Sequence, residues 1–173
     1  KLSGTLTLND YTVALSGSSS DVAAALDGTF ASTYTGSATV TDTHILAELK
    51  TINNGTTGTI TLNDYSVALS GSSSDVAAAL DGTFADQYTG AVALNDAHTL
   101  AELKTINNQT NATITLTNYD VNLSGTSADV AAALAGTFAA GYTGTATVND
   151  NHSLAELVAI NNGTSGNITL NSN

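Results

Sequence analysis

Three histidines stand in one short pattern that could carry chemistry, D-x-H-x-x-x-E. The pattern occurs as Asp42, His44 and Glu48, as Asp96, His98 and Glu102, and as Asp150, His152 and Glu156. A His and a Glu four residues apart share one face of a helix, and the Asp stands just before that helix. The imidazole and the two carboxylates could therefore hold a divalent metal ion. The competing interpretation, which we prefer, is structural: the Asp caps the helix, the His bonds to a neighbouring segment and the Glu is solvated.

The same three sets argue against an enzyme, because equivalent groups spaced along a chain do not form one catalytic cleft. Serines are plentiful, but the sequence has neither a G-x-S-x-G nucleophile motif nor a Gly-rich phosphate loop. The segment Gly17–Asp21 (GSSSD) lacks the lysine of a phosphate loop, and we expect it to cap a helix. The chain has no cysteine, which excludes disulfides and thiolate metal sites. We therefore expect no enzyme, no catalytic residues and no cofactor other than calcium.

Calcium is considered because acidic residues recur where strands are expected to end. These residues are Asp10, Asp42, Asp64, Asp96 and Asp150, with Asn118 in place of one further Asp. Ladders of carboxylate oxygens can bind hard cations. Neither an EF-hand loop nor a G-G-x-G-x-D nonapeptide is present, so the pattern specifies no particular calcium site. A diffuse cation atmosphere is the expected outcome.

Threonine pairs of the form T-x-T offer a second binding surface. Side chains alternate along a strand, which exposes the pairs Thr5 and Thr7, Thr39 and Thr41, Thr59 and Thr61, Thr113 and Thr115, and Thr145 and Thr147. Parallel strands would line these hydroxyl groups into an array that resembles those on ice-binding solenoids. Ala91 and Ala93 interrupt the array, and threonine is also simply a good strand former. Ice or glycan binding is therefore the alternative, and strand formation the preferred interpretation.

The elements that position all these residues come from a repeat of 54 residues. The units span residues 4–57, 58–111 and 112–165, and residues 166–173 begin a fourth. The first and second units are identical at 41 of 54 positions, and the second and third at 34 of 54, so each unit is expected to fold alike. Every aromatic residue, six Tyr and three Phe, occupies a repeated position. Packing between units is the preferred role for them, and a ligand-stacking platform is the alternative.

Each unit divides into half-units of about 32 and 22 residues, because residues 57–64 (TGTITLND) are echoed by residues 89–96 (TGAVALND). After the first strand of the second unit, Tyr65–Leu69 (YSVAL) alternates like a second strand. Ser72–Asp75 then matches a capping box, and Asp81 and Gly82 close the helix.

In the shorter half-unit, Asp96 is the expected N-cap of a helix whose buried face carries Leu100, Leu103 and Ile106. Asn107 and Asn108 are expected to end that helix in left-handed geometry.

The order strand, strand, helix, strand, helix predicts the α/β class. We expect residues 1–173 to form a single α/β solenoid of stacked strand–helix coils with a parallel sheet, similar in general architecture to leucine-rich repeats. Bare strand edges at both ends would invite end-to-end association with further copies or neighbouring repeats.

Composition narrows the partners and the location. The net charge is −12 with only three lysines, so nucleic acid and anionic membrane surfaces are poor partners, and we expect no nucleic acid partner. No apolar run approaches the roughly 18 residues that cross a bilayer, so membrane insertion is not expected. The chain begins at Lys1 without a signal peptide, and we expect it to be excised from a longer protein.

The combined signature, TGxVTVTDxHTLAELKxINN with SGSSxDVAAALxGTF, resembles the tandem-repeat regions of very large bacterial cell-surface proteins, of the kind found in marine cyanobacteria. The resemblance covers nearly the whole chain. It implies an extracellular or cell-surface array that spans, coats or adheres, and it supplies no catalytic residues. A non-enzymatic spacer or adhesive scaffold is therefore the expected function. The alternative is a binding module that reads ice, glycan or calcium through its Thr or Asp ladders.

Overall fold

Short helices and short strands alternate along the chain in the computed structural model, which describes residues 4–171. The six helices within those residues are α1 (Ser19–Leu26), α2 (Leu46–Gly55), α3 (Ser73–Leu80), α4 (Leu100–Gln109), α5 (Ser127–Leu134) and α6 (Leu154–Gly163). The strands are β1 (Leu15–Gly17), β2 (Ala38–Val40), β3 (Ile60–Thr61), β4 (Leu69–Gly71), β5 (Val92–Leu94), β6 (Thr113–Thr115), β7 (Leu123–Gly125), β8 (Thr137–Phe138), β9 (Ala146–Val148) and β10 (Ile168–Leu170). The mixed α/β class predicted from the sequence is confirmed.

The eight-residue helices begin and end where the sequence predicts. In α3 the Ser72 hydroxyl accepts a hydrogen bond from the backbone N–H of Asp75 at 3.1 Å, and Asp81 is the C-cap. Val76, Ala79 and Leu80 are buried, as expected from their spacing. After the first turn, the remaining positions of the helix are Ala77 and Ala78, and alanine favours the helical conformation intrinsically.

The ten-residue helices differ from the prediction at both ends. Helix α4 starts at Leu100 with Thr99, not Asp96, as its N-cap. It continues to Gln109, beyond Asn108, and its C-cap Thr110 is extended (φ −124°, ψ 144°). No residue in 4–171 has a positive φ, so the prediction that Asn107 and Asn108 end the helix in left-handed geometry was wrong.

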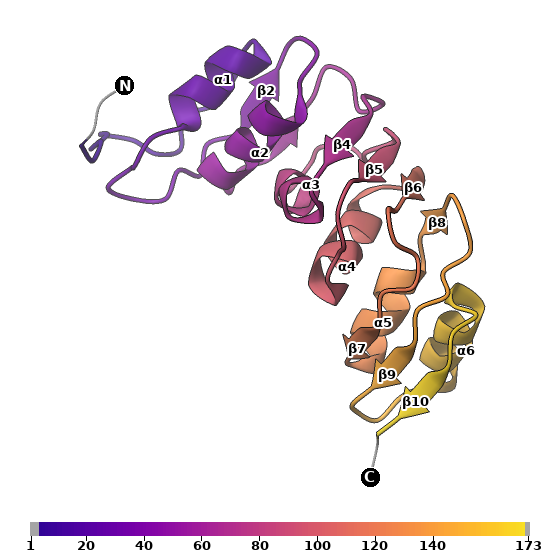
Figure 1. Cartoon of the computed structure of the whole chain (residues 1–173). Helices are drawn as coiled ribbons and strands as arrows, with labels where there is room; N and C mark the ends of the chain where they lie inside the picture. The colour runs from indigo at the N-terminus through magenta and orange to yellow at the C-terminus, as the bar shows by residue number, and fades with distance from the viewer. Residues whose placement is uncertain (1–3, 172–173) are drawn as a thin grey trace.

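All strand pairs among the described residues are parallel, and they form three sheets. Their strand orders are β1-β2-β3, β4-β5-β6-β8 and β10-β9-β7. Each helix packs against the next helix along the chain. Figure 1 shows the elements following one another along a curved body with the two termini at opposite ends.

The predicted second strand at Tyr65–Leu69 was wrong, because only Leu69 belongs to β4. The Asp64 carboxylate accepts hydrogen bonds from the Ser66 backbone N–H at 2.8 Å and the Ser66 hydroxyl at 2.6 Å. This turn bends the chain away from extended geometry until Leu69.

A strand-like segment that is not among the predicted elements follows each eight-residue helix. Ile60 donates to the Thr83 carbonyl at 2.8 Å and accepts from the Ala85 N–H at 2.9 Å. The equivalent segment in the third unit is β8, which pairs with β6.

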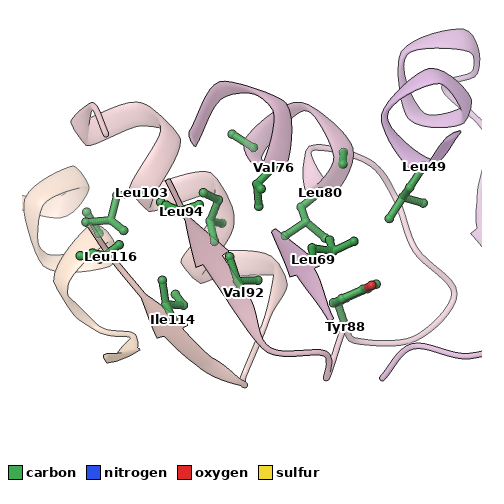
Figure 2. Close-up of a cluster of buried hydrophobic side chains, with 14 of the residues drawn as sticks. Leu49, Leu69, Val76, Leu80, Tyr88, Val92, Leu94, Leu103, Ile114 and Leu116 are labelled. Atoms are coloured by element: carbon green, nitrogen blue, oxygen red, sulfur yellow. The ribbon is translucent and has the colours of Figure 1, made fainter. Parts of the chain in front are cut away.

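The core lies between the strands and the helices, as Figure 2 shows for the middle of the chain. Leu69, Val92 and Ile114 reach into it from three neighbouring strands, and each is at most 1% exposed. Val76 and Leu103 meet them from α3 and α4. Successive units thus contribute to one continuous layer of apolar side chains. Within residues 4–171, no helix is both long enough and apolar enough to cross a membrane.

Candidate functional site

Each D-x-H-x-x-x-E set forms a cluster with the start of the preceding eight-residue helix. In the middle cluster, the Ser73 backbone N–H donates to the Asp96 carboxylate at 2.6 Å. The Ser73 hydroxyl lies 3.1 Å from Glu102 and 3.2 Å from the carbonyl of Ala97, so its one proton is shared between two acceptors. Ser73 is only 2% exposed, so both carboxylates satisfy polar groups that water does not reach.

The first cluster repeats this arrangement, and the third repeats the bond from the serine N–H to the Asp. Ser19 donates from its N–H to Asp42 at 2.7 Å and from its hydroxyl to Glu48 at 2.6 Å. The Ser127 N–H donates to Asp150 at 2.7 Å. Each Asp therefore caps the helix that lies 23 residues earlier in the chain, and the predicted capping of its own helix was wrong. A carboxylate at a helix N-terminus is stabilised by the orphan amides and the helix dipole.

The glutamates also close the N-termini of their own helices. Glu102 accepts from the Thr99 N–H and from the Thr99 hydroxyl, both at 2.8 Å, while the Thr99 oxygen accepts from the Glu102 N–H at 3.3 Å. Ser153 and Glu156 form the same reciprocal pair, and their hydrogen bonds lower the pKa of Glu156. These glutamates are partly exposed, as the predicted solvated role requires, and they have in addition a capping role that was not predicted.

The histidines turn toward the following unit. His44 Nε2 lies 2.9 Å from the Tyr88 hydroxyl, and His98 Nε2 lies 2.9 Å from the Tyr142 hydroxyl. Because Tyr88 donates its one proton to the Val67 carbonyl at 2.6 Å, its oxygen is the acceptor for His44. This fixes the neutral tautomer with the proton on Nε2.

Burial explains the protonation of these histidines. His44 is fully buried and its Nδ1 has no hydrogen-bond partner. Desolvation lowers the pKa of His44, and the negative charges of Asp64, Glu48 and Asp42 oppose that shift only in part. The pKa of His98 is lowered for the same reason, with Glu102 and Asp96 opposing. Burial also raises the pKa of the tyrosines that accept from them, Tyr88 and Tyr142.

The clusters therefore do not gather metal ligands. In each of the first two, the carboxylates bond to a serine of the preceding helix while the imidazole bonds to a tyrosine of the next unit. Across residues 4–171, no three His, Asp or Glu side chains come together as a potential metal site. The buried serines donate to carboxylates and carbonyls rather than to an imidazole base, so the geometry of a nucleophile activated by His does not arise.

The strand-end aspartates outside the clusters are held in their own turns. Asp10 accepts from the Thr12 N–H and hydroxyl, both at 2.7 Å, and Asp64 accepts from Ser66 in the same way. These hydrogen bonds lower the pKa of both carboxyl groups. Asn118 accepts from the Asp120 N–H at 3.0 Å and forms the equivalent turn.

The hydroxyl groups of the strands form rows that the T-x-T pattern only half predicted. Thr39 pairs with Thr61 on one side and with Ser16 on the other. Thr147 likewise lies between Ser124 and Thr169. The row of the middle sheet is Ser70, Ala93 and Thr115, so the expected alanine interruption is present. The serines were missed because they stand in Leu-Ser-Gly rather than T-x-T.

No family model, no curated protein and no solved structure matches this chain.

Proposed function

We propose that the chain is a non-enzymatic structural repeat module, a spacer or adhesive scaffold. The observation that carries the proposal is the use made of its reactive side chains. Each of the first two clusters bonds backward to a serine 23 residues earlier and forward to a tyrosine 44 residues later. Side chains that could have formed a catalytic or metal site instead hydrogen-bond consecutive segments to one another.

The architecture behind this function is an α/β solenoid of strand–helix coils, similar in general plan to leucine-rich repeats. Parallel pairing in chain order and the packing of each helix on the next support it. In such a stack every unit stabilises its neighbours, and length grows with copy number. The acidic, sulfur-free composition and the resemblance of the repeat signature support an extracellular or cell-surface array of bacterial type.

Copy number provides the test. A chain with a second copy of residues 58–111 inserted after Asn111 should unfold in denaturant with a larger free energy than the parent. A third copy should add a similar increment, since each copy brings one more set of nearest-neighbour contacts. An inserted unit that leaves stability unchanged, or that unfolds separately at the midpoint of an isolated unit, would refute the proposal.

The hydroxyl rows favour a second candidate, a binding module for ice or glycan. Thr61 is exposed at the edge of the row formed with Ser16 and Thr39. If that row binds ice, Thr61→Lys should abolish inhibition of ice recrystallisation, while Asn63→Lys on a nearby loop should leave it intact. Equal behaviour of the two variants and the parent would eliminate the ice-binding version.

A further inference from the structure

The face of α6 that looks away from α5 lacks the cover that the equivalent faces of α2 and α4 have. Leu154 is 80% exposed, whereas its equivalents Leu46 and Leu100 are half-buried. The side chain of Leu46 lies against Gly71 and that of Leu100 against Gly125, in the strand before the next helix. Leu157 is half-buried where its equivalents Leu49 and Leu103 are fully buried.

The histidine of this face, His152, also lacks the hydrogen-bond partner that the other two histidines have. His152 is half-exposed, and within residues 4–171 no tyrosine hydroxyl bonds to its Nε2 as Tyr88 and Tyr142 do to the other histidines. Its Nδ1 is buried without a partner, as in the first two clusters.

The opposite end of the chain carries the matching gaps. A Cβ on Gly17 would meet only Asp21 and Val22 of its own unit, at 3.8 and 3.9 Å, whereas Gly71 and Gly125 are each covered by a leucine. Ala25 on α1 is exposed, while its equivalents in α3 and α5, Ala79 and Ala133, are fully buried.

Two further positions at this end, Gly28 and Tyr34, lack the polar partners that their equivalents have. Gly82 and Gly136 are contacted by the side chains of Asn53 and Asn107, but no asparagine of the described chain reaches Gly28. The Tyr34 hydroxyl donates to the Val13 carbonyl at 2.5 Å, yet within residues 4–171 no histidine donates to it.

We propose that a second copy of this chain docks its α1 end on the α6 face, head to tail, and so repeats the packing of α2 on α3. Leu154 of the first copy would lie on Gly17 of the second, and His152 would donate to Tyr34 of the second copy. Asn161 would contact Gly28 of the second copy as Asn53 contacts Gly82 and Asn107 contacts Gly136. Those contacts stand at the two inner junctions, the contacts between consecutive units within the chain. The inference rests on the proposed stack, since it extends the inner interface α2–α3 beyond the end of the chain.

Docking requires one terminal segment to leave, because residues 166–171 of the first copy and residues 4–9 of the second are equivalent parts of the repeat. Leu6 is joined to Phe30 by a single bridge, with hydrogen bonds to Thr29 and Ala31 at 2.8 Å. β10 is paired with β9 over three residues. The more weakly held Leu6 segment of the second copy is therefore displaced, and Ile168 takes its place.

One position distinguishes this junction from the inner ones and supplies a sharp test. Lys50 and Lys104 form ion pairs with Asp75 and Asp129 across the two inner junctions. At the end face the lysine is replaced by Val158, which is 50% exposed. Asp21 of a second copy would face Val158, so Val158→Lys should strengthen docking and Val158→Glu should weaken it.

Sedimentation velocity on the full chain, from about 1 µM to about 1 mM in constant salt, measures the association. Val158→Lys should tighten it about two- to five-fold, the range of a partly exposed ion pair, and Val158→Glu should loosen it by a similar factor. The double variant Val158→Glu with Asp21→Lys should restore it. Leu154→Lys should weaken it at least ten-fold through lost burial.

Asn63→Lys and Asn63→Glu, on an exposed loop of the central unit, are the charge-matched controls and should leave association unchanged. Melting curves at low concentration verify that every variant monomer is folded. Monomers throughout for both the parent and Val158→Lys would overturn the inference, as would equal effects of the end-face and control variants. The stability measurements on chains with an inserted copy of residues 58–111 use dilute, monomeric protein. Absence of self-association would therefore overturn the docking inference without affecting the test of the proposed repeat stack.

Discussion

At the scale of single residues, the polar groups of the clusters serve partners that are distant in sequence. Ser73 contributes a buried N–H and a buried hydroxyl, and Asp96 and Glu102 accept from them. His44 donates its only hydrogen bond from Nε2, and it remains neutral because burial disfavours the charged ring, whose Nδ1–H would have no acceptor. Losing one member leaves another buried polar group unsatisfied, which costs about 1–3 kcal/mol.

The buried histidines predict a pH dependence of stability. The pKa values of His44 and His98 lie below the unfolded value of 6.5, so the unfolded chain binds protons that the folded chain does not. The free energy of unfolding should therefore fall as pH decreases below 6.5, by at most about 1.4 kcal/mol per pH unit for each histidine. Denaturant titrations at pH 7.5, 6.5, 5.5 and 5.0 measure it.

The matched control is His44→Gln with His98→Gln, which keeps a side-chain amide donor and removes the titration. This variant should show a flatter profile between pH 6.5 and 5. The pKa values of carboxyl groups such as those of Asp64 and Asp75 are lowered by their hydrogen bonds, so these groups contribute little between pH 6.5 and 5. A parent profile as flat as that of the variant would contradict the assignment.

The sequence identifies the cluster residues, but it does not identify their partners. Asp, His and Glu are recognisable from their spacing, and a structural role for them was the preferred interpretation. Asp96 was nevertheless assigned to the wrong helix, because its hydrogen bond to Ser73 depends on how two segments 23 residues apart pack together. The pairing of His44 with Tyr88 has the same origin, since no local pattern links residues 44 positions apart.

At the scale of elements, the three ten-residue helices differ in their N-caps. Thr99 and Ser153 cap α4 and α6 through their hydroxyl groups, whereas Ile45 at the start of α2 has no side-chain acceptor. Ile45 is 60% exposed, so its apolar side chain contributes little burial.

We expect Ile45→Thr to raise the free energy of unfolding by about 0.5–2 kcal/mol, the usual range for a restored cap. Thr99→Ile is the reverse change at the equivalent position and should destabilise by a similar amount. Thermal melts of both variants check the prediction, and a shift of the same sign in both would contradict it.

Glycines before the buried strands allow two backbone segments to approach closely. A Cβ on Gly90 would collide with the carbonyl oxygen of Val67 and would stand 2.8 Å from the ring of Tyr88. Gly90→Ala should therefore destabilise the chain by about 1–3 kcal/mol or more, as overpacking does.

Gly141 is the matched control for this substitution. A Cβ there meets nothing within 4 Å, its φ is not positive, and Thr33 and Gln87 occupy the equivalent positions. Gly141→Ala should be neutral or stabilise by about 0.4–1 kcal/mol. Denaturant unfolding compares the two variants, and equal losses of stability would contradict the close approach at Gly90.

Helix positions followed from the sequence because apolar spacing and serine caps are local signals. The strand predicted at Tyr65–Leu69 failed because a local turn at Asp64 overrides the alternation of its residues. The segment around Phe84 was missed for another reason: it is a strand only through its pairing with Ile60, and Gly-Thr-Phe has no alternating pattern of useful length.

At the scale of the whole molecule, stability is expected to come from contacts between units rather than from bound ions. The strand-end aspartates are satisfied by their own turns and by neighbouring helices. The melting temperature should therefore be nearly the same in EDTA and in millimolar calcium. Any small shift from general charge screening should also appear with magnesium at the same concentration, which is the control. A calcium-specific shift of more than about 5 °C, equivalent to roughly 2 kcal/mol for a domain of this size, would reveal a structural calcium site.

The shape of the molecule tests the stacked architecture most directly. Small-angle X-ray scattering should be recorded on the parent chain and on chains with one and two extra copies of residues 58–111. We predict that the maximum dimension increases with each copy while the cross-sectional radius stays constant, because each unit adds to the end of a stack. A radius of gyration that grows only as about the 0.38 power of chain length, with a widening cross-section, would show a compact globule and contradict the stack.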